Sequence, residues 1–154
     1  MPNPRPALPD EVIRTATVRV ALSPGEALDL FTARGEIGWA PGWWPRYVTP
    51  ADGEPREGGV WLTEQEGQEV IWRVERFDRA AGAAEYLRIT PGNRLVTVEV
   101  DCRPSGEHTA ATVRYRAIAL SESGRQWLDG FTEEHYAAMM AEWETLIAAH
   151  LAAR

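Results

Sequence analysis

The sequence contains no lysine, since all 16 of its basic residues are arginine. This excludes enzymes that use a lysine for Schiff-base chemistry, for pyridoxal phosphate attachment or for holding nucleotide phosphates. A single cysteine, Cys102, excludes an intramolecular disulfide and a multi-cysteine metal site. The three histidines, His108, His135 and His150, show no metal-ligand spacing, so we expect no metal and no cofactor.

The chain also lacks a basic run and a long hydrophobic segment. Its formal net charge of -7 disfavours nucleic acid and anionic membrane surfaces as partners. Residues 1–10 have no apolar core of the kind that a signal peptide needs, and no segment reaches membrane-spanning length. We therefore expect a cytoplasmic protein without membrane insertion. Its 154 residues fit one domain, residues 13–154, after a flexible tail at residues 1–12.

Strand and helix patterns follow one another in the first third of the chain. Residues 15–22, TATVRVAL, alternate between apolar and polar side chains, which predicts a first strand. Residues 23–31, SPGEALDLF, predict a short helix with Ser23 as its N-cap. Residues 35–48, GEIGWAPGWWPRYV, hold three of the seven tryptophans between prolines and glycines, and here we expect a second, broken helix.

Between residues 58 and 120 the pattern changes to antiparallel strands joined by hairpins. Turns are expected at residues 66–67, at residues 91–92 and near residues 103–108. The first turn would place Trp61 opposite Trp72.

The turn at residues 91–92 would place Leu87 opposite Val96, and the last turn would place Val98 opposite Val113. Such pairing gives the sheet one apolar and one charged face. The predicted apolar face consists of Trp61, Trp72, Val74, Leu87, Ile89, Val96, Val98, Val100, Val113, Tyr115 and Ala117, with Glu85 and Arg94 at its rim. The predicted outer face consists of Arg73, Glu75, Tyr86, Arg88, Thr97, Glu99, Arg114 and Arg116.

The chain ends in a segment that predicts one long helix. From Ser123 onward there is neither proline nor a strand pattern, and about thirty residues would give a helix on the order of 45 Å long. Its apolar stripe, which should cover the apolar face of the sheet, would comprise Leu128, Phe131, His135, Met139, Trp143 and Leu146. Gly130 is the weak point at which this helix could bend.

Four stretches carry a resemblance to a known family. They are LSPGEALDLFTARGEIGWAPGW near the N-terminus, VIWRVERFD and YLRITPGNR in the strands, and TVRYRAIALSESG before the last helix. Together they resemble the SRPBCC superfamily, the helix-grip domains related to START lipid-binding proteins and plant pollen allergens. The resemblance extends to bacterial members that are often labelled polyketide cyclase-like and mostly have no assigned activity.

The resemblance covers residues 13 to 152 and implies an α+β helix-grip fold. In this fold a curved antiparallel sheet wraps around a long C-terminal helix, and two short helices follow the first strand. The resemblance also implies a hydrophobic cavity between the sheet and the long helix. The candidate ligand-binding residues around that cavity are Trp39, Trp43, Trp44, Trp61, Trp72, Tyr115, His135 and Met139.

Each of these candidates also has a structural interpretation. Trp39, Trp43 and Trp44 follow the first helix, which the resemblance places at the cavity mouth. They either plug that mouth as ordinary core or form a wall against which a flat ligand stacks. The two tryptophans expected on the sheet, Trp61 and Trp72, fit core packing as well.

His135 and Tyr115 are the candidate catalytic residues. His135 is either a core histidine bonded to a backbone carbonyl or an acid–base and ligand-orienting group in the cavity. The hydroxyl of Tyr115 needs a partner when buried, which makes this residue the other candidate for a polar ligand contact.

Three functions remain open. The leading hypothesis is the binding of a small hydrophobic or aromatic ligand in the internal cavity. The alternative is an enzyme of the polyketide cyclase or aromatase type, in which His135 or Tyr115 moves a proton. A protein-interaction domain, like heat-shock ATPase activators with a related domain, would need an outer apolar patch, which the charged outer face disfavours. The oligomeric state has no signal in the sequence.

Overall fold

A seven-stranded antiparallel sheet is the framework of the computed structural model, which describes residues 7–154. The strands lie in the order β1-β7-β6-β5-β4-β3-β2, so every neighbour except β1 and β7 is also a neighbour in sequence. Their bounds are β1 Glu11–Val20, β2 Arg46–Thr49, β3 Val60–Gln65, β4 Gln68–Asp78, β5 Ala83–Thr90, β6 Arg94–Ser105 and β7 His108–Ala119.

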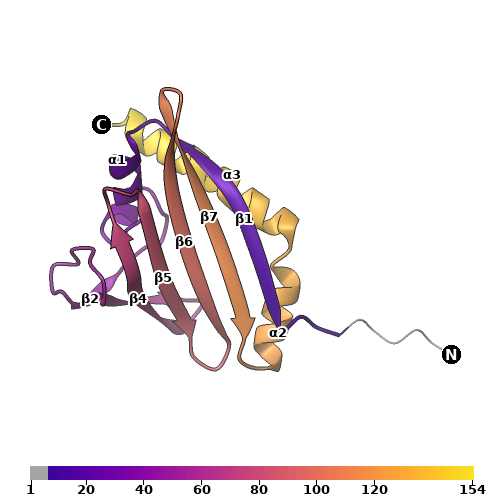
Figure 1. Cartoon of the computed structure of the whole chain (residues 1–154). Coiled ribbons are helices and arrows are strands. Elements are labelled where there is room, and N and C mark those ends of the chain that lie inside the picture. The colour runs from indigo at the N-terminus through magenta and orange to yellow at the C-terminus, as the bar shows by residue number, and fades with distance from the viewer. Residues whose placement is uncertain (1–6) are drawn as a thin grey trace.

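Two short helices follow the first strand in sequence, and two further helices follow the last strand. They are α1 Pro24–Asp29, the short 3-10 helix η1 Gly35–Gly38, α2 Glu122–Gly130 and α3 Glu133–Ala152. Helix α3 runs along β1, α2 contacts β7 at the N-terminal end of α3, and α1 contacts β6 and β7 (Figure 1). The expected α+β architecture of a curved sheet around C-terminal helices is confirmed.

The first third of the chain departs from the predicted boundaries. Strand β1 begins at Glu11, inside the segment expected as a tail, and the expectation for residues 1–6 lies outside the described residues. Helix α1 has Ser23 as its N-cap, as predicted. The second helix expected in residues 35–48 is only the one turn of η1. Its continuation is broken at Gly42, which has a φ of 72°, and the segment ends in strand β2.

The predicted registers are correct in one hairpin and wrong in two. Trp61 lies opposite Trp72, as expected for a two-residue turn. Val98 lies opposite Tyr115 instead of Val113, a shift of two residues that keeps the predicted faces.

In the β5–β6 hairpin Leu87 pairs with Thr97, and Arg88 pairs with Val96. The loop contains three residues, 91–93, instead of two. The resulting one-residue slip moves every side chain of β5 to the opposite face of the sheet.

This slip corrects the predicted composition of both faces. Tyr86 and Arg88, expected outside, are buried on the inner face. Leu87 and Ile89, expected inside, alternate with them on the outer face and are half-buried, and so is Glu85. The inner face therefore carries a basic residue that the hydrophobic pattern had assigned to solvent.

The C-terminal segment forms two helices instead of one. Helix α2 ends at Gly130, the predicted weak point, and Phe131 leaves the helical conformation. The side chain of Thr132 then caps α3 by accepting a hydrogen bond from the His135 backbone N–H at 3.1 Å. The break changes the helical phase, so α3 buries Tyr136, Met140 and Ile147.

The predicted stripe is correct for Leu128 and Phe131, which are buried. In α3 the most buried positions lie one residue later than predicted. Met139, Trp143 and Leu146 are partly buried against the core, and of this stripe only the side chain of His135 is exposed.

Candidate functional site

An open cleft of about 420 Å³ lies between the sheet and the region where α2 meets α3. It is lined by the β3–β4 turn, the inner faces of β4 to β7, and residues of both helices. Its apolar walls are Val70, Trp127, Phe131 and Met139, and its polar lining consists of Gln65, Glu66, Gln68, Arg88, Thr90, Arg94, Tyr115 and His135. The cleft therefore combines an aromatic wall with two arginines.

Arg88 is directed into the cleft by the register of β5 and is only 9% exposed. Its Nη2 donates a hydrogen bond to Oε1 of Gln65, and its guanidinium lies 5.1 Å from the ring centre of Trp72. Its Nε has no hydrogen-bond partner among the described residues. Burial lowers the pKa of Arg88, and the nearby Tyr115 and Glu36 oppose this effect. Arginine nevertheless stays charged in proteins, so the cleft holds a buried cation.

Arg94 opens strand β6 and adds a second cation. Its guanidinium lies 3.7 Å above the ring centre of Trp127, and its Nη1 donates to Oδ1 of Asn93 at 2.7 Å. Within residues 7–154 its Nε also has no partner. Burial, together with repulsion from Arg88, lowers the pKa of Arg94 to about 10. Both guanidinium groups therefore remain protonated at neutral pH and repel one another.

Two hydroxyl groups lie beside these cations. Thr90 is 1% exposed, and its Oγ1 is buried without a hydrogen-bond partner in the described part of the chain. Burial raises the pKa of Tyr115 to about 12, so this phenol is neutral at physiological pH. The ring of Tyr115 packs 5.8 Å from Phe131 and 5.5 Å from Tyr136, which fixes its position in the cleft wall.

Glu36, on the short helix η1, is a carboxyl group turned toward the interior. Desolvation raises its pKa to about 8, and the opposing effect of Arg88 is smaller. Glu36 also contributes to the raised pKa of Tyr86 and of Tyr115, after burial as the main cause in each. No ion pair within 4.0 Å joins Glu36 to an arginine in the described chain. At neutral pH this carboxyl is largely protonated.

Solved structures of low sequence identity share the arrangement of sheet and helices. Ara h 8.0201 matches 90% of this chain and 99% of its own length with a TM-score of 0.63 at 10% identity. Norcoclaurine synthase from Thalictrum flavum matches 90% of this chain and 87% of its own with a TM-score of 0.63 at 14% identity. Protein CV1439 from Chromobacterium violaceum matches 91% and 95% with a TM-score of 0.60 at 12% identity.

The chain shares the helix-grip fold of these structures. No protein-family model matches the chain, and no curated protein sequence matches it either. At these identities the likeness concerns the fold alone. The norcoclaurine synthase has also been solved in complex with dopamine and hydroxybenzaldehyde.

Within this helix-grip fold, the cleft brings together three of the predicted site residues. Tyr115, His135 and Met139 all line it, and Trp72 borders it through its contact with Arg88. His135 is not the core histidine of the first interpretation, because its side chain is exposed at the cleft opening, with its ring 5.9 Å from Phe131. Its role as an acid–base or orienting group stays a prediction.

The three tryptophans of residues 35–48 do not line this cleft. Trp39 and Trp43 are held by the backbone, because their indole Nε1 atoms donate to the carbonyl oxygens of Leu30 and Ala33, each at 2.8 Å. Trp44 is 77% exposed. Trp39 and Trp43 therefore fit the interpretation as core packing, and Trp44 lies on the surface of the helix-grip domain.

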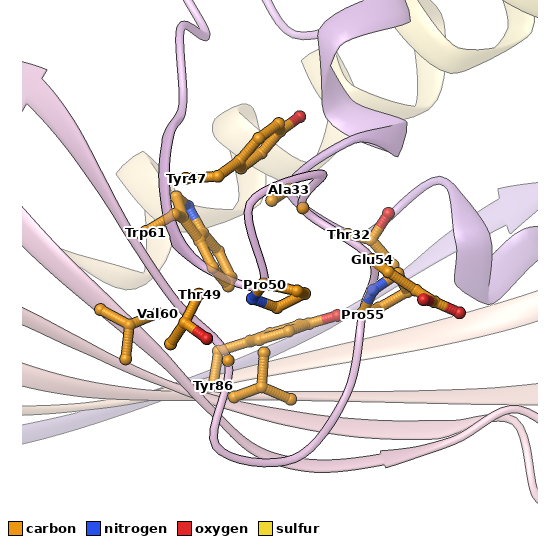
Figure 2. Close-up of a pocket in the computed structure, with 13 residues that line it drawn as sticks. Thr32, Ala33, Tyr47, Thr49, Pro50, Glu54, Pro55, Val60, Trp61 and Tyr86 are labelled. Atoms are coloured by element: carbon orange, nitrogen blue, oxygen red, sulfur yellow. The ribbon is translucent and has the colours of Figure 1, made fainter.

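Trp61 belongs to a smaller hollow on the same inner face of the sheet, between strands β3 to β5 and the segment at residues 47–55. Its ring stacks on Trp72 at 5.5 Å and 7°, and it faces a space of about 10 Å³ beside Tyr86 and the segment at residues 47–55 (Figure 2). Such a volume holds about one water molecule at most. The aromatic side chains of this hollow therefore act as core, and the larger cleft is the candidate ligand site.

The described residues do not support a metal site or a reactive cysteine. Residues 7–154 contain no group of three or more histidine, cysteine, aspartate or glutamate side chains placed to hold a metal ion. Burial raises the pKa of the Cys102 thiol to about 12, which keeps it protonated and unreactive. None of the helices described here is both long enough and apolar enough to cross a membrane.

The residues that sequence reasoning missed are Arg88, Thr90, Arg94 as a cleft residue, Trp127 and Glu36. The faces of β5 could have been predicted from Asn93. This residue belongs to the loop after Thr90, and the longer loop exchanges the inner and outer side chains of the strand. Glu36 carried no signal, because a lone acidic residue in a short irregular segment is usually solvated.

Proposed function

We propose that this protein binds a small, largely apolar or aromatic molecule in the cleft between the sheet and helices α2 and α3. A volume of about 420 Å³ lies in the range of known ligand sites. The walls formed by Trp127, Phe131 and Met139 offer apolar burial, and a few convergent polar groups would orient the bound molecule. The single observation that carries the proposal is this open cleft at the place where the resemblance implies a cavity. A helix-grip neighbour that holds two small aromatic molecules supports it.

The proposal is tested with N-phenyl-1-naphthylamine, an uncharged probe that fluoresces in apolar sites. The wild-type protein is expected to bind it saturably. Met139→Trp, which adds bulk to the cleft wall, is expected to weaken binding at least tenfold. Ala138→Trp adds the same bulk at an exposed position of α3 and serves as the matched control, with unchanged affinity expected. Absence of saturable binding to the wild type, or equal affinity in both variants, would contradict the proposal.

One observation favours an enzyme of the cyclase or aromatase type as the second candidate. Glu36 does not line the cleft itself, but a carboxyl group with a pKa of about 8 is suited to exchange a proton with a substrate that reaches past the cleft lining to it. In that case Glu36→Gln would abolish turnover while binding of the probe is retained. Tyr115, with a pKa of about 12, would act as a hydrogen-bond donor in such a reaction.

The protein-interaction alternative has less support. The outer face of the sheet carries ion pairs such as Arg114 with Glu99 at 2.9 Å and Arg73 with Glu75 at 2.8 Å. A face whose charged side chains form ion pairs with one another is not the apolar patch that such a role requires.

A further inference from the structure

We infer that the ligand of this cleft carries a carboxylate, which Arg88 and Arg94 bind while the apolar body of the ligand lies against Trp127, Phe131 and Met139. The inference rests on the proposed function and adds the chemical class of the ligand. An apolar molecule without an acidic group would leave both cations of the cleft without a close negative charge.

The first observation is a set of unpaired polar atoms on one side of the cleft. In the described chain the Nε atoms of Arg88 and Arg94 and the Oγ1 of Thr90 lack hydrogen-bond partners, although each residue is at least nine-tenths buried. Thr90 and Arg94 are direct cross-strand partners, and Arg88 lies two residues before Thr90 on the same face. The three groups therefore converge on one place. Buried polar groups are normally paired, so such a cluster indicates a partner that binds from outside.

The second observation is that neither arginine of the cleft has a close ion pair. Glu66 also lines the cleft and attracts Arg94, but only from beyond ion-pair distance. Among residues 7–154 no carboxylate lies within 4.0 Å of Arg88 or Arg94. Their hydrogen-bond acceptors, Gln65 and Asn93, are neutral amides. Exposed arginines of the same chain do have acidic partners, such as Arg79 with Asp29 at 3.0 Å. Burying two neighbouring cations without a negative charge is unfavourable, and an anionic ligand would relieve this cost.

The third observation concerns the shape of the charged groups. Both guanidinium groups lie over tryptophan rings, Arg88 at 5.1 Å from the ring centre of Trp72 and Arg94 at 3.7 Å from that of Trp127. One Nη atom of each guanidinium donates to a neutral amide, and the Nε atom of each has no partner in the described chain, so N–H donors remain available for a ligand. A carboxylate matches the edge of a guanidinium with two parallel hydrogen bonds, and its planar shape fits a site bounded by aromatic rings.

The experiment compares naphthalene-1-acetate with its primary amide, which has nearly the same shape and no charge. Isothermal titration calorimetry measures both affinities for the wild type, Arg88→Gln and Arg94→Gln. Arg73→Gln on the outer face of β4 provides the same change of charge outside the cleft. We expect the acid to bind the wild type and Arg73→Gln at least tenfold more tightly than the amide. In the two cleft variants this preference should fall to less than threefold.

The outcomes separate this inference from the proposed function. Equal affinity of acid and amide for the wild type, or a preference that persists in both cleft variants, would overturn the inference. Binding of N-phenyl-1-naphthylamine without binding of the acid would overturn it too, and would leave the proposed function in place. If none of the three probes binds, the proposed function itself fails. Arg94 lies at the start of its strand, so Arg94→Gln carries the test if Arg88→Gln does not fold.

Naphthyl phosphate distinguishes the two anionic groups that arginines commonly bind. Guanidinium groups bind both anions with paired hydrogen bonds, so the assignment rests on shape. A planar carboxylate fits beside the rings of Trp72 and Trp127 better than a tetrahedral phosphate, which predicts that naphthalene-1-acetate binds more tightly than 1-naphthyl phosphate. The reverse order would overturn the assignment to a carboxylate.

Discussion

Replacing Trp39 with alanine is expected to lower the free energy of unfolding by about 3–5 kcal/mol. Trp39 is 5% exposed, its indole Nε1 donates to the Leu30 carbonyl at 2.8 Å, and its ring packs 5.4 Å from Trp143 of α3. Removing the indole leaves a cavity between η1 and α3 and an unpaired carbonyl oxygen. Urea denaturation followed by circular dichroism measures the change.

The matched control is Trp44→Ala. Trp44 is exposed, so its removal is expected to change stability by less than about 0.5 kcal/mol. If Trp39→Ala cost less than about 1 kcal/mol and weakened probe binding instead, Trp39 would be a ligand wall and its assignment to the core would be wrong.

Replacing Glu36 with glutamine is expected to stabilise the protein at pH 8 by about 2–4 kcal/mol. In the unfolded chain this carboxyl loses its proton near pH 4.5, whereas desolvation in the folded protein raises its pKa to about 8. Between these values the folded state holds the extra proton, so the wild type loses stability as the pH rises from 4.5 to 8. Glutamine keeps the shape of the side chain and has no such loss.

Urea denaturation at intervals from pH 5 to pH 9 measures the difference between the variant and the wild type. The advantage of Glu36→Gln should grow up to about pH 8 and then level off. Glu142→Gln, at an exposed position of α3, should show a flat difference over the same range. A flat difference for Glu36→Gln as well would mean that the carboxyl of Glu36 is solvated.

Much of the fold could be predicted because its signals are local. Alternating strands, the two-residue turn after Gln65 and the helical composition from Ser123 onward gave the element order and the pairing of Trp61 with Trp72. Two errors in the predicted faces of the sheet and of the last helix came from single residues. Asn93 belongs to the loop and inverts β5, and Phe131 interrupts the last helix and rotates the stripe that contains His135.

The candidate site was predicted only in its apolar part. Tyr115 and Met139 were found because they follow the period of a core strand and of an amphipathic helix. In β5 the same rule fails, because Leu87 and Ile89 face outward while Arg88 and Thr90 face inward. A strand that turns its polar residues toward the interior contradicts its own hydrophobic pattern. Such contradictions are expected where a binding site, and not packing alone, selects the residues.

The tryptophan-rich segment also shows the limit of pattern reasoning. Three tryptophans near an expected cavity mouth gave two interpretations that composition could not separate. The backbone carbonyls that accept from Trp39 and Trp43 are set by the turns between α1 and β2, which have no regular period. Only the three-dimensional course of this segment assigns these rings to the core.

The most direct test of the cleft as ligand site is a nuclear magnetic resonance titration of the ¹⁵N-labelled protein with naphthalene-1-acetate. The indole N–H signals of the seven tryptophans report on separate parts of the molecule. The account predicts large, saturable shifts for Trp127 and for the backbone amides of Thr90 and Arg94, with Trp44 unchanged. Saturable shifts confined to Trp44 and its neighbours, or no shifts at millimolar ligand, would contradict it.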